Sequence, residues 1–210
     1  MELSLARVVP AFRRVGGAVR YGLIGIRCKR LFEARLSDLH APPSAMPVTY
    51  RFGGLDDLHH LTADRHGYDE TAKRLLRRRL REGDRLVLGD VDGKPIFSGW
   101  LMLGAIECGT QGPLCVSPRR AYSYKLHTVE AFRGKRVMSG FYRFIEPLLL
   151  ALGYRSIVCW ITKSNAASIA AHRRLGFTCI GQAHELLLGP WAGLWTGRSL
   201  RQRLKETVQL

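Results

Sequence analysis

The amino-acid sequence predicts an α+β fold, in which a mixed, mostly antiparallel sheet is flanked by helices. Asp92-Gly93 is a favourable hairpin turn between two strand-like segments, which places those segments antiparallel. A strand-like segment that ends at Val129 leads into a helix near Val137, and a buried strand follows that helix. A strand–helix–strand unit brings its two strands together in parallel. Antiparallel and parallel pairs are therefore expected in one sheet.

Between residues 47 and 106 the sequence predicts the first half of the sheet and two helices. Asp69 is a suitable N-cap for an amphipathic helix over residues 68–82. The buried stripe of this helix is expected to consist of Leu75, Leu76 and Leu80. The other expected elements are a strand at residues 47–52, a short helix from Gly54, and strands at residues 85–90 and 96–106.

The second half of the sheet begins with a strand at residues 122–129, followed by a helix at residues 137–152. Pro147 lies inside that helix and removes a backbone hydrogen bond, so a kink or a frayed end is expected. The remaining elements are a strand at residues 156–161, a helix led by Asn165, a strand at residues 178–188, and either a final strand or a loop around Trp191 and Trp195. Alternation along the strand at residues 122–129 places Tyr122, Tyr124, Leu126 and Thr128 on one face, and Ser123, Lys125, His127 and Val129 on the other.

The turn between residues 129 and 139 has the properties of an anion site. A strand that ends at Val129 and a helix that begins near Val137 leave the backbone N–H groups of residues 134–139 unpaired, with the positive end of the helix dipole behind them. Lys135 and Arg136 add two positive charges, and a guanidinium suits bidentate contact with phosphate. A pyrophosphate fits such a turn.

A second motif runs from Asn165 to Phe177. Asn165 or Ser164 is a good N-cap, the alanines that follow favour a helix, and Gly176 suits the position just after the helix end. A helix of this build can be purely structural or can serve a ligand, and its own residues leave both readings open.

Taken in order, the strand, the phosphate-type turn, the helix, the next strand, the Asn-led helix and Leu175-Gly176-Phe177 resemble the core of the GNAT superfamily of acyl-CoA-dependent N-acyltransferases. The resemblance implies a GNAT-like acyl-CoA N-acyltransferase fold. It also implies that residues 133–138 hold the CoA pyrophosphate, although Arg136 and Met138 stand where small residues are usual. His172 stands where the family has a tyrosine near the thioester sulfur.

The resemblance implies an N-acyltransferase, most simply an N-acetyltransferase, that moves the acyl group of acetyl-CoA or another acyl-CoA to an amine acceptor by direct attack, without a metal. CoA is expected between the strands at residues 122–129 and 156–161, where a main-chain N–H polarises the acyl carbonyl. The expected CoA-binding residues are His127, Thr128, Val129, Arg133, Gly134, Lys135, Arg136, Val137, Met138, Ser139, Asn165 and Ser168.

Catalysis requires a base for the attacking amine and a proton donor for the departing sulfur. Glu130, His127 and Glu107 are the candidate bases, and the sequence does not rank them. His172 is the expected donor to the sulfur. Two alternatives stay open: a degenerate, non-catalytic module that binds anionic partners, and an acyltransferase whose longer acyl chain is admitted by the apolar residues 141–152.

The chain is strongly basic, with 33 Lys and Arg residues against 17 Asp and Glu residues and a formal net charge of +16. This charge attracts polyanions: nucleic acid, an anionic membrane or an acidic substrate. Much of it lies on the polar face of the helix at residues 68–82, which lacks the interleaved aromatic residues that stack on nucleic-acid bases. A solvated helix face is therefore favoured over a nucleic-acid site.

Residues 1–44 are expected to form a basic amphipathic N-terminal extension, and residues 45–210 the acyltransferase domain, with the boundary at Ala41-Pro42-Pro43-Ser44. Apolar residues from Val8 to Ile26 recur at helical spacing beside a stripe of arginines. Such a helix can lie on an anionic membrane through residues 1–40, or pack on its own domain or a sister subunit. No apolar run is long enough for a signal or membrane span, which favours a cytoplasmic protein with peripheral contact at the inner membrane face.

Cysteine and histidine spacing does not indicate a metal site. The five cysteines include no Cys-x-x-Cys pair, and His59, His60 and His66 with Asp64 match no zinc pattern. An odd number of cysteines without such a pair fits a reducing compartment.

Overall fold

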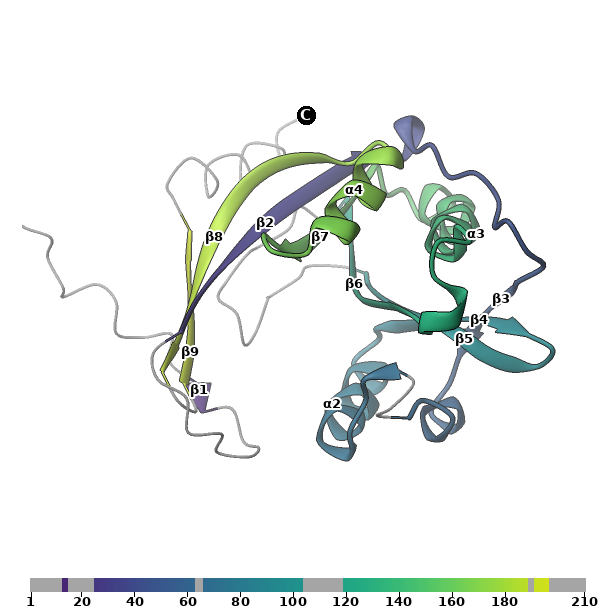
Figure 1. The fold of residues 1–210 in the computed structure, drawn as a ribbon, viewed down its shortest axis with the longest axis horizontal. Coiled ribbons are helices and arrows are strands. Elements are labelled where there is room, and N and C mark those ends of the chain that lie inside the picture. Colours follow the sequence, from purple (N-terminus) through teal and green to yellow (C-terminus); the bar gives the residue numbers. More distant parts are fainter. Residues whose placement is uncertain (1–12, 15–24, 63–65, 104–118, 189–190, 197–210) are drawn as a thin grey trace, which may run out of the picture.

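The computed structural model of the chain describes residues 13–14, 25–62, 66–103, 119–188 and 191–196. These form a nine-stranded sheet with the order β1-β9-β8-β2-β7-β6-β5-β4-β3 (Figure 1). Strands β6 and β7 are parallel, whereas the other recorded pairs are antiparallel, which confirms the expected mixed sheet. The strands are β1 (Arg13–Arg14), β2 (Gly25–Arg35), β3 (Thr49–Gly53), β4 (Arg85–Val91), β5 (Lys94–Met102), β6 (Arg120–Thr128), β7 (Ser156–Thr162), β8 (Thr178–Leu188) and β9 (Trp191–Thr196).

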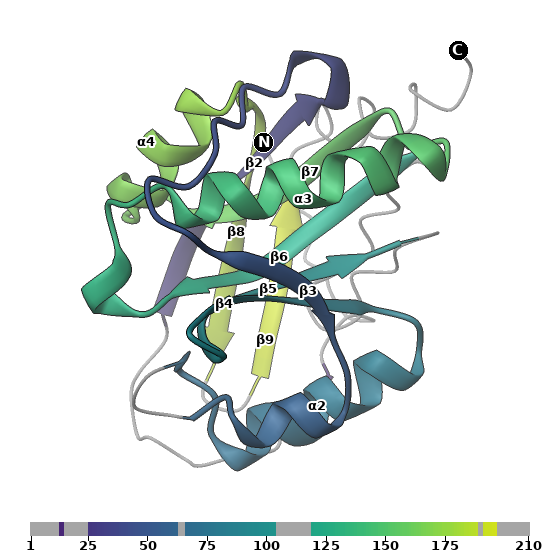
Figure 2. The same ribbon diagram turned by 90° about the vertical axis from the view of Figure 1, so that its right-hand side faces the viewer.

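Helices cover both faces of the β3–β6 half of the sheet (Figures 1 and 2). The larger core cluster contains Phe141 of α3 and Ile169 of α4, and the smaller one contains Leu76 of α2. Along β4, Val87 belongs to the larger cluster and Leu86 to the smaller one, as strand alternation requires. The helices are α2 (Glu70–Arg81), α3 (Val137–Ala151) and α4 (Ala166–Arg174), with 3-10 turns η3 (Leu36–Asp38), η4 (Asp56–His59) and η5 (Glu130–Phe132).

The expected helix caps and ends are mostly found. Asp69 caps α2, because its side chain accepts a hydrogen bond from the N–H of Ala72 at 2.7 Å. Leu76 is buried as expected, but Leu75 is 41% exposed, so its assignment to the buried stripe is wrong. Helix α3 continues through Pro147 to Ala151, and the frayed end expected there is not observed.

Strand β2 corrects the interpretation of the N-terminal region. Residues Gly25–Arg35 lie between β7 and β8 in the sheet, so the helix expected up to Ile26 is wrong over this part. Leu31 and Phe32 are both buried, which anchors β2 in the core. The boundary expected at residue 44 is therefore not a domain boundary, because β2 is part of the same sheet. The rest of the expected extension, residues 1–12 and 15–24, lies outside the described residues, and membrane contact there stays a prediction.

The segment of residues 36–48, called the crossing segment below, passes over α3 on its way from β2 to β3 (Figure 2). Its His40 N–H donates to the carbonyl of Leu175 at 3.1 Å, and its Ala45 N–H donates to the carbonyl of Lys135 at 2.9 Å. The hydroxyl of Ser139 donates to the carbonyl of Pro42. The crossing segment thus holds the beginning of α3 and the end of α4 in fixed positions.

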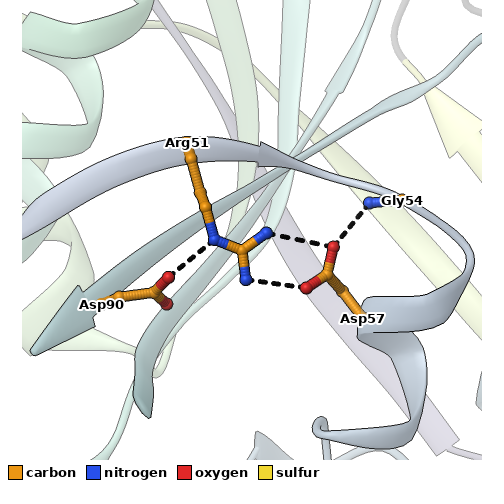
Figure 3. A network of polar contacts seen from close by, with 4 residues as sticks. All are labelled: Arg51, Gly54, Asp57 and Asp90. Carbon is orange, nitrogen blue, oxygen red and sulfur yellow. Dashed lines mark hydrogen bonds and ion pairs between the residues drawn. The ribbon is translucent and has the colours of Figure 1, made fainter. Parts of the chain in front are cut away.

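An ionic network fixes β3, the edge strand. Arg51 forms ion pairs of 2.7 Å with both Asp57 of η4 and Asp90 of β4, and the Gly54 N–H donates to Asp57 at 2.8 Å (Figure 3). The hydrogen bond from Arg51 lowers the pKa of Asp57. Because Arg51 contacts one carboxylate of β4 and one of η4, the network attaches this strand to the sheet and to the turn that follows.

Strand β6 does not alternate as expected. Lys125 has a positive φ of 47°, and the pairing with β5 shifts between Ser98 and Trp100. Tyr124 packs with the α2 cluster, whereas Leu126 packs with the α3 cluster, so the two do not share a face. The bulge at Lys125 inverts the expected faces beyond that point.

Candidate functional site

Strands β6 and β7 pair over a short distance and then separate. Their parallel pairing comprises Arg120 with Ser156, Ala121 with Ile157, and Tyr122 with Val158. Beyond these pairs β6 continues to Thr128 and β7 to Thr162, and the two halves of the sheet diverge (Figure 1). We call residues 123–128 and 159–162 the fork. A strand edge without a partner strand presents backbone groups that can bind an extended ligand.

The end of β6 offers a backbone donor toward the fork. The Val129 N–H donates to the Ile96 carbonyl of the preceding β5 at 2.9 Å, so this group is already paired. Because successive N–H groups of a strand point to opposite edges, the Thr128 N–H points away from β5, toward the side of the fork. Of the expected CoA-binding residues on β6, Thr128 therefore has the best-placed N–H.

The turn of residues 133–136 links β6 to α3. Gly134 and Arg136 have positive φ values of 77° and 55°, which reverse the chain tightly before the helix. The first hydrogen bond of the helix runs from the Gly140 N–H to the Arg136 carbonyl at 3.2 Å. The N–H groups of residues 137–139 precede it and have no partner within the helix. All four turn residues are exposed, as an anion site requires.

The turn is held in place from two sides. Arg133 Nε donates to the Thr128 carbonyl at 3.2 Å, which ties the turn back to the end of β6. The crossing segment contacts the carbonyls of Lys135 and Arg136 through Ala45 and Ser44. These contacts occupy carbonyl oxygens and leave the positive groups of Lys135 and Arg136 on the surface. The turn that the sequence predicts to bind an anion is therefore held in a fixed conformation by contacts with its backbone.

Helix α4 begins as expected, because the Asn165 side chain accepts a hydrogen bond from the Ser168 N–H at 3.1 Å. Asn165 thus has a capping role in addition to any contact with a ligand. At the other end, Gly176 has a φ of 95°, and a Cβ there would lie 2.6 Å from the carbonyl oxygen of Asp38. Both ends of α4 are therefore fixed relative to β7 and the crossing segment.

His172 lies inside the protein, with 2% of its surface exposed. Its Nδ1 is 2.8 Å from the carbonyl oxygen of Ser168, and its Nε2 is 3.1 Å from the hydroxyl of Tyr142. The rings of His172 and Phe177 pack edge to face with centroids 5.1 Å apart. Burial lowers the pKa of His172, and the hydrogen bond with Ser168 only partly opposes this effect. The imidazole is therefore neutral near neutral pH, with both nitrogens bonded to protein groups.

Sequence reasoning missed Tyr142, which contacts His172, and Ser123 and Cys159, which contact Tyr142. Tyr142 of α3 is fully buried, and its hydroxyl lies 3.0 Å from Ser123 Oγ, the first residue of the fork on β6. Ser123 Oγ is also 3.5 Å from the carbonyl oxygen of Val158 on β7. The thiol of Cys159 lies beside the same Tyr142 hydroxyl, and burial raises its pKa. The only signal in the sequence was a tyrosine within the apolar stripe of a helix.

The two candidate bases near the end of β6 lie apart from His172. Glu130 is exposed in η5. His127 is half-buried, with its ring 6.3 Å from that of His66. Because Leu126 faces the α3 cluster, His127 points to the opposite face of β6. Glu107, the third candidate, lies outside the described residues.

A second group of ionisable side chains lies on the α2 face of β6. The Tyr124 hydroxyl donates to Asp84, and the Arg79 guanidinium is 5.0 Å from the Tyr124 ring centroid and 3.6 Å from Asp84. Burial raises the pKa of Asp84 and lowers that of Lys125. These contacts connect α2 to the sheet around the β6 bulge.

Within the described parts of the chain, no group of three or more His, Cys, Asp and Glu side chains could hold a metal ion, and no helix is long and apolar enough to cross a membrane.

An open depression of about 600 Å³ lies at the start of β6, at the far end of the strand from the turn. Its position separates it from the fork. It is lined by Arg119, Leu150, Leu152, Gly153, Tyr154 and Arg155.

Residues 55–177 match the family model of the Acetyltransferase (GNAT) family. This range contains the fork, the turn of residues 133–136 and the helix that carries His172. No curated protein matches the sequence.

Solved structures of similar fold include a conserved protein of unknown function from Staphylococcus epidermidis, with 8% identity and a TM-score of 0.59 over 79% of this chain and 63% of that chain. A putative acetyltransferase from the GNAT family from Novosphingobium aromaticivorans has 15% identity and a TM-score of 0.52 over 89% of this chain and 69% of that one. AAC(6')-Iy, in complex with the bisubstrate analogue CoA-S-monomethyl-acetylneamine, has 16% identity and a TM-score of 0.53 over 63% of this chain and 92% of that one. The chain thus spans less than two thirds of the Staphylococcus epidermidis protein. These likenesses confirm the expected GNAT-like fold.

Proposed function

Because the chain belongs to the GNAT acetyltransferase family, we propose that it is an acyl-CoA-dependent N-acyltransferase, most simply an N-acetyltransferase. The observation that carries this proposal is the fork, with the exposed, basic turn at the beginning of α3 next to the end of β6. One strand edge and one helix N-terminus together suit a ligand that has an extended amide-containing arm and a pyrophosphate.

In this proposal the CoA pyrophosphate lies on the N–H groups at the start of α3, with Lys135 and Arg136 contributing charge. The pantetheine arm follows the β6 edge at residues 127–129. The N–H groups proposed to face the pyrophosphate belong to Val137, Met138 and Ser139. Arg136 precedes them and is exposed, so its side chain does not cover these N–H groups in this proposal. The expected CoA-binding residues Asn165 and Ser168 lie at the start of α4, which follows β7, the other strand of the fork.

The reaction is attack of a neutral amine on the thioester carbonyl. The nitrogen–carbon bond forms, the carbon–sulfur bond breaks, and one proton passes from nitrogen to sulfur in the overall balance. The Thr128 N–H is the proposed donor to the carbonyl oxygen as negative charge develops there. Glu130, which is exposed, and His127, which is half-buried, are the proposed groups for removing the proton from the amine, and His172 is the proposed group at the sulfur.

Thiol release from acetyl-CoA in the presence of a panel of amines, amino sugars, peptides and lysine derivatives tests this function. Calorimetric titration of acetyl-CoA is the matching binding measurement. We expect saturable binding, and amine-dependent release of free CoA with at least one acceptor. Binding without turnover by acetyl-CoA or longer acyl-CoA would favour the non-catalytic module, and no binding at millimolar ligand would contradict the proposal.

A further inference from the structure

The two faces of the fork differ in what they offer to a ligand. On the α3 face, the base of the fork is closed by Tyr142 and His172, which are 0% and 2% exposed. On the α2 face, Lys125 is exposed and His127 is half-buried. A molecule that has to reach a thioester at the edge of β6 can therefore approach from the α2 face, where side chains of the fork meet the solvent.

The bulge in β6 directs Lys125 toward the α2 face. Its φ of 47° is uncommon for a residue other than glycine, and bulges beside functional sites serve to redirect a side chain. Tyr68 contacts both ends of this residue. The Tyr68 hydroxyl donates to the Lys125 carbonyl at 3.2 Å, and the Lys125 ammonium lies 5.4 Å from the centroid of the tyrosine ring. The position of the ammonium is thus supported by the fold.

The Lys125 ammonium has no anionic partner in the described part of the chain, where no carboxylate lies within ion-pair distance of it. Two charged groups act on it from the side of α2. Asp69 attracts it, but this carboxylate already accepts the N–H of Ala72 as the cap of α2, and Arg79 repels it. Partial burial is the larger cause of the lowered pKa of Lys125, and the charge of Arg79 adds to it. A bound anion offsets both effects.

The other cation on this face is already neutralised. Arg79 lies 3.6 Å from Asp84, and the Tyr124 hydroxyl donates to the same carboxylate. The Tyr124 ring stacks on that of Tyr122 with centroids 5.5 Å apart, and both residues are half-buried. Next to Lys125 in the chain there is therefore partly exposed aromatic surface, while the positive charge of Lys125 itself stays uncompensated.

We propose that Lys125 binds a carboxylate of the acceptor, so that the protein acylates amines that also carry a carboxylate group. This inference rests on the proposed acyltransferase function, and it places the acceptor on the α2 face of the fork. The ammonium provides three hydrogen-bond donors and a compact charge, which suit a carboxylate. Lys125 lies on the same strand as Thr128, the proposed donor to the thioester carbonyl. Lys125 determines specificity and takes no part in the proton transfers.

The test compares amino acids with their neutral amides: glycine with glycinamide, β-alanine with β-alaninamide, and 4-aminobutyrate with 4-aminobutyramide. For each pair, the ratio of kcat/KM for the acid to that for the amide is measured in the wild type and in Lys125→Gln. Comparing the ratios between proteins cancels the difference in basicity between the two amines. For the pair of best-fitting length, we expect Lys125→Gln to lower the ratio about 10-fold, the effect of one hydrogen bond to a charged group.

The loss should appear as a higher KM for the acid, with the KM for acetyl-CoA unchanged. Lys125→Arg keeps the charge and should keep the preference for acids. Arg143→Gln, on the exposed face of α3, removes one positive charge from the other side of the sheet and should leave the ratio unchanged. An equal fall in Arg143→Gln, or a ratio that Lys125→Gln leaves unchanged in every pair, would overturn the carboxylate site.

Carbon NMR of Lys125 Cε gives a readout that does not depend on turnover. The signal, assigned with Lys125→Arg, should report a pKa below the usual lysine value in the free protein. This pKa should rise when the N-acetyl derivative of one of the three acids is added, and the matching N-acetyl amide should leave it unchanged. A pKa that no carboxylate changes would overturn the site even in an active enzyme. Absence of thiol release by the wild type with every acceptor would contradict the acyltransferase function, and the titration would then decide separately whether Lys125 binds a carboxylate.

Discussion

Gly140 of α3 lies directly against Tyr50 of β3, and a Cβ at this position would come within 2.7 Å of Cε2 of the tyrosine ring. The same Cβ would lie 2.5 Å from Ser44 Oγ of the crossing segment. The Tyr50 hydroxyl bonds to Ser44 and to the Val137 carbonyl, so this contact sets the distance between α3, β3 and the crossing segment. The position of the turn of residues 133–136 therefore depends on a glycine inside a helix.

Replacement of Gly140 by alanine is expected to destabilise the protein by about 1–3 kcal/mol, because the added methyl group forces Tyr50 and Ser44 apart. This outweighs the gain of about 1 kcal/mol that alanine normally gives over glycine within a helix. Urea denaturation measures the difference. Gly54→Ala is the control, since a Cβ at Gly54 meets nothing within 4 Å. Equal denaturation midpoints for Gly140→Ala and the wild type would show that the contact relaxes at no cost.

Reversal of charge at the turn should weaken acyl-CoA binding. In the double variant Lys135→Glu/Arg136→Glu we expect the KM for acetyl-CoA to rise by about 10-fold or more, since each charge-assisted contact contributes about 1.5–3 kcal/mol. The value of kcat should change far less, because these contacts are equal in the ground and transition states. Arg74→Glu/Arg81→Glu on the exposed face of α2 makes the same change in net charge. A similar rise in KM for both double variants would indicate long-range attraction by the protein's charge in place of a phosphate contact at the turn.

Glu33 and Arg120 form a buried ion pair at the closed end of the β6–β7 pairing. Their side chains are 17% and 7% exposed, the Arg120 Nε lies 2.8 Å from Glu33 Oε1, and Ser156 donates to the same carboxylate at 2.7 Å. Glu33→Ala removes the carboxylate that faces the buried guanidinium and should cost about 3–5 kcal/mol. Glu82 forms an exposed ion pair with Arg78 and serves as the comparison. Glu82→Ala should cost at most about 1 kcal/mol. Thermal or urea unfolding of the two variants compares them, and similar losses would mean that the buried pair is screened by water.

Burial of neutral His172 makes stability depend on pH. Its pKa is lowered in the folded protein, so below 6.5 the unfolded chain binds a proton that the folded protein does not. The stabilisation is complete above pH 6.5 and is lost as the pH falls toward the lowered pKa, by at most about 1.4 kcal/mol per pH unit. Unfolding free energies at pH 7.5 and 5.5 should therefore differ more in the wild type than in His172→Gln. An equal pH dependence in both proteins would mean that His172 titrates normally in the fold.

Local patterns predicted most of the regular elements. The strand expected at residues 178–188 is β8, and the helices led by Asp69 and Asn165 have those residues as their caps. Strand β2 was missed because Leu31 and Phe32 are buried on opposite faces, which removes the alternation that marks a half-exposed strand. Both edges of β2 are paired only because β7 and β8, distant in sequence, receive it between them, which no local pattern predicts.

The site was predictable where it depends on backbone geometry and not where it depends on side chains from several elements. The turn before α3 and the cap at Asn165 each lie within a few residues of sequence, so local rules reach them. The bulge at Lys125 has no sequence signal, because lysine rarely adopts a positive φ. The contact of Tyr142 with His172 joins two helices and requires the packed core, so the sequence pointed to the histidine without its neighbour.

Truncation of the N-terminal region distinguishes a removable extension from an integral strand. A chain that lacks residues 1–40 loses β2, which leaves the facing edges of β7 and β8 without a partner and removes Leu31 and Phe32 from the core. Unpaired strand edges promote aggregation, so we expect this chain to be insoluble or unfolded.

A chain that lacks only residues 1–12 keeps both β1 and β2 and should fold with unchanged affinity for acetyl-CoA. Circular dichroism and calorimetry of the two truncated chains, with sedimentation of the shorter truncation on anionic vesicles, measure folding, ligand binding and membrane contact separately. Loss of sedimentation with folding intact would support a membrane-binding role for the first residues. A soluble, folded chain without residues 1–40 would mean that the sheet closes without β2, and would restore the boundary at residue 44.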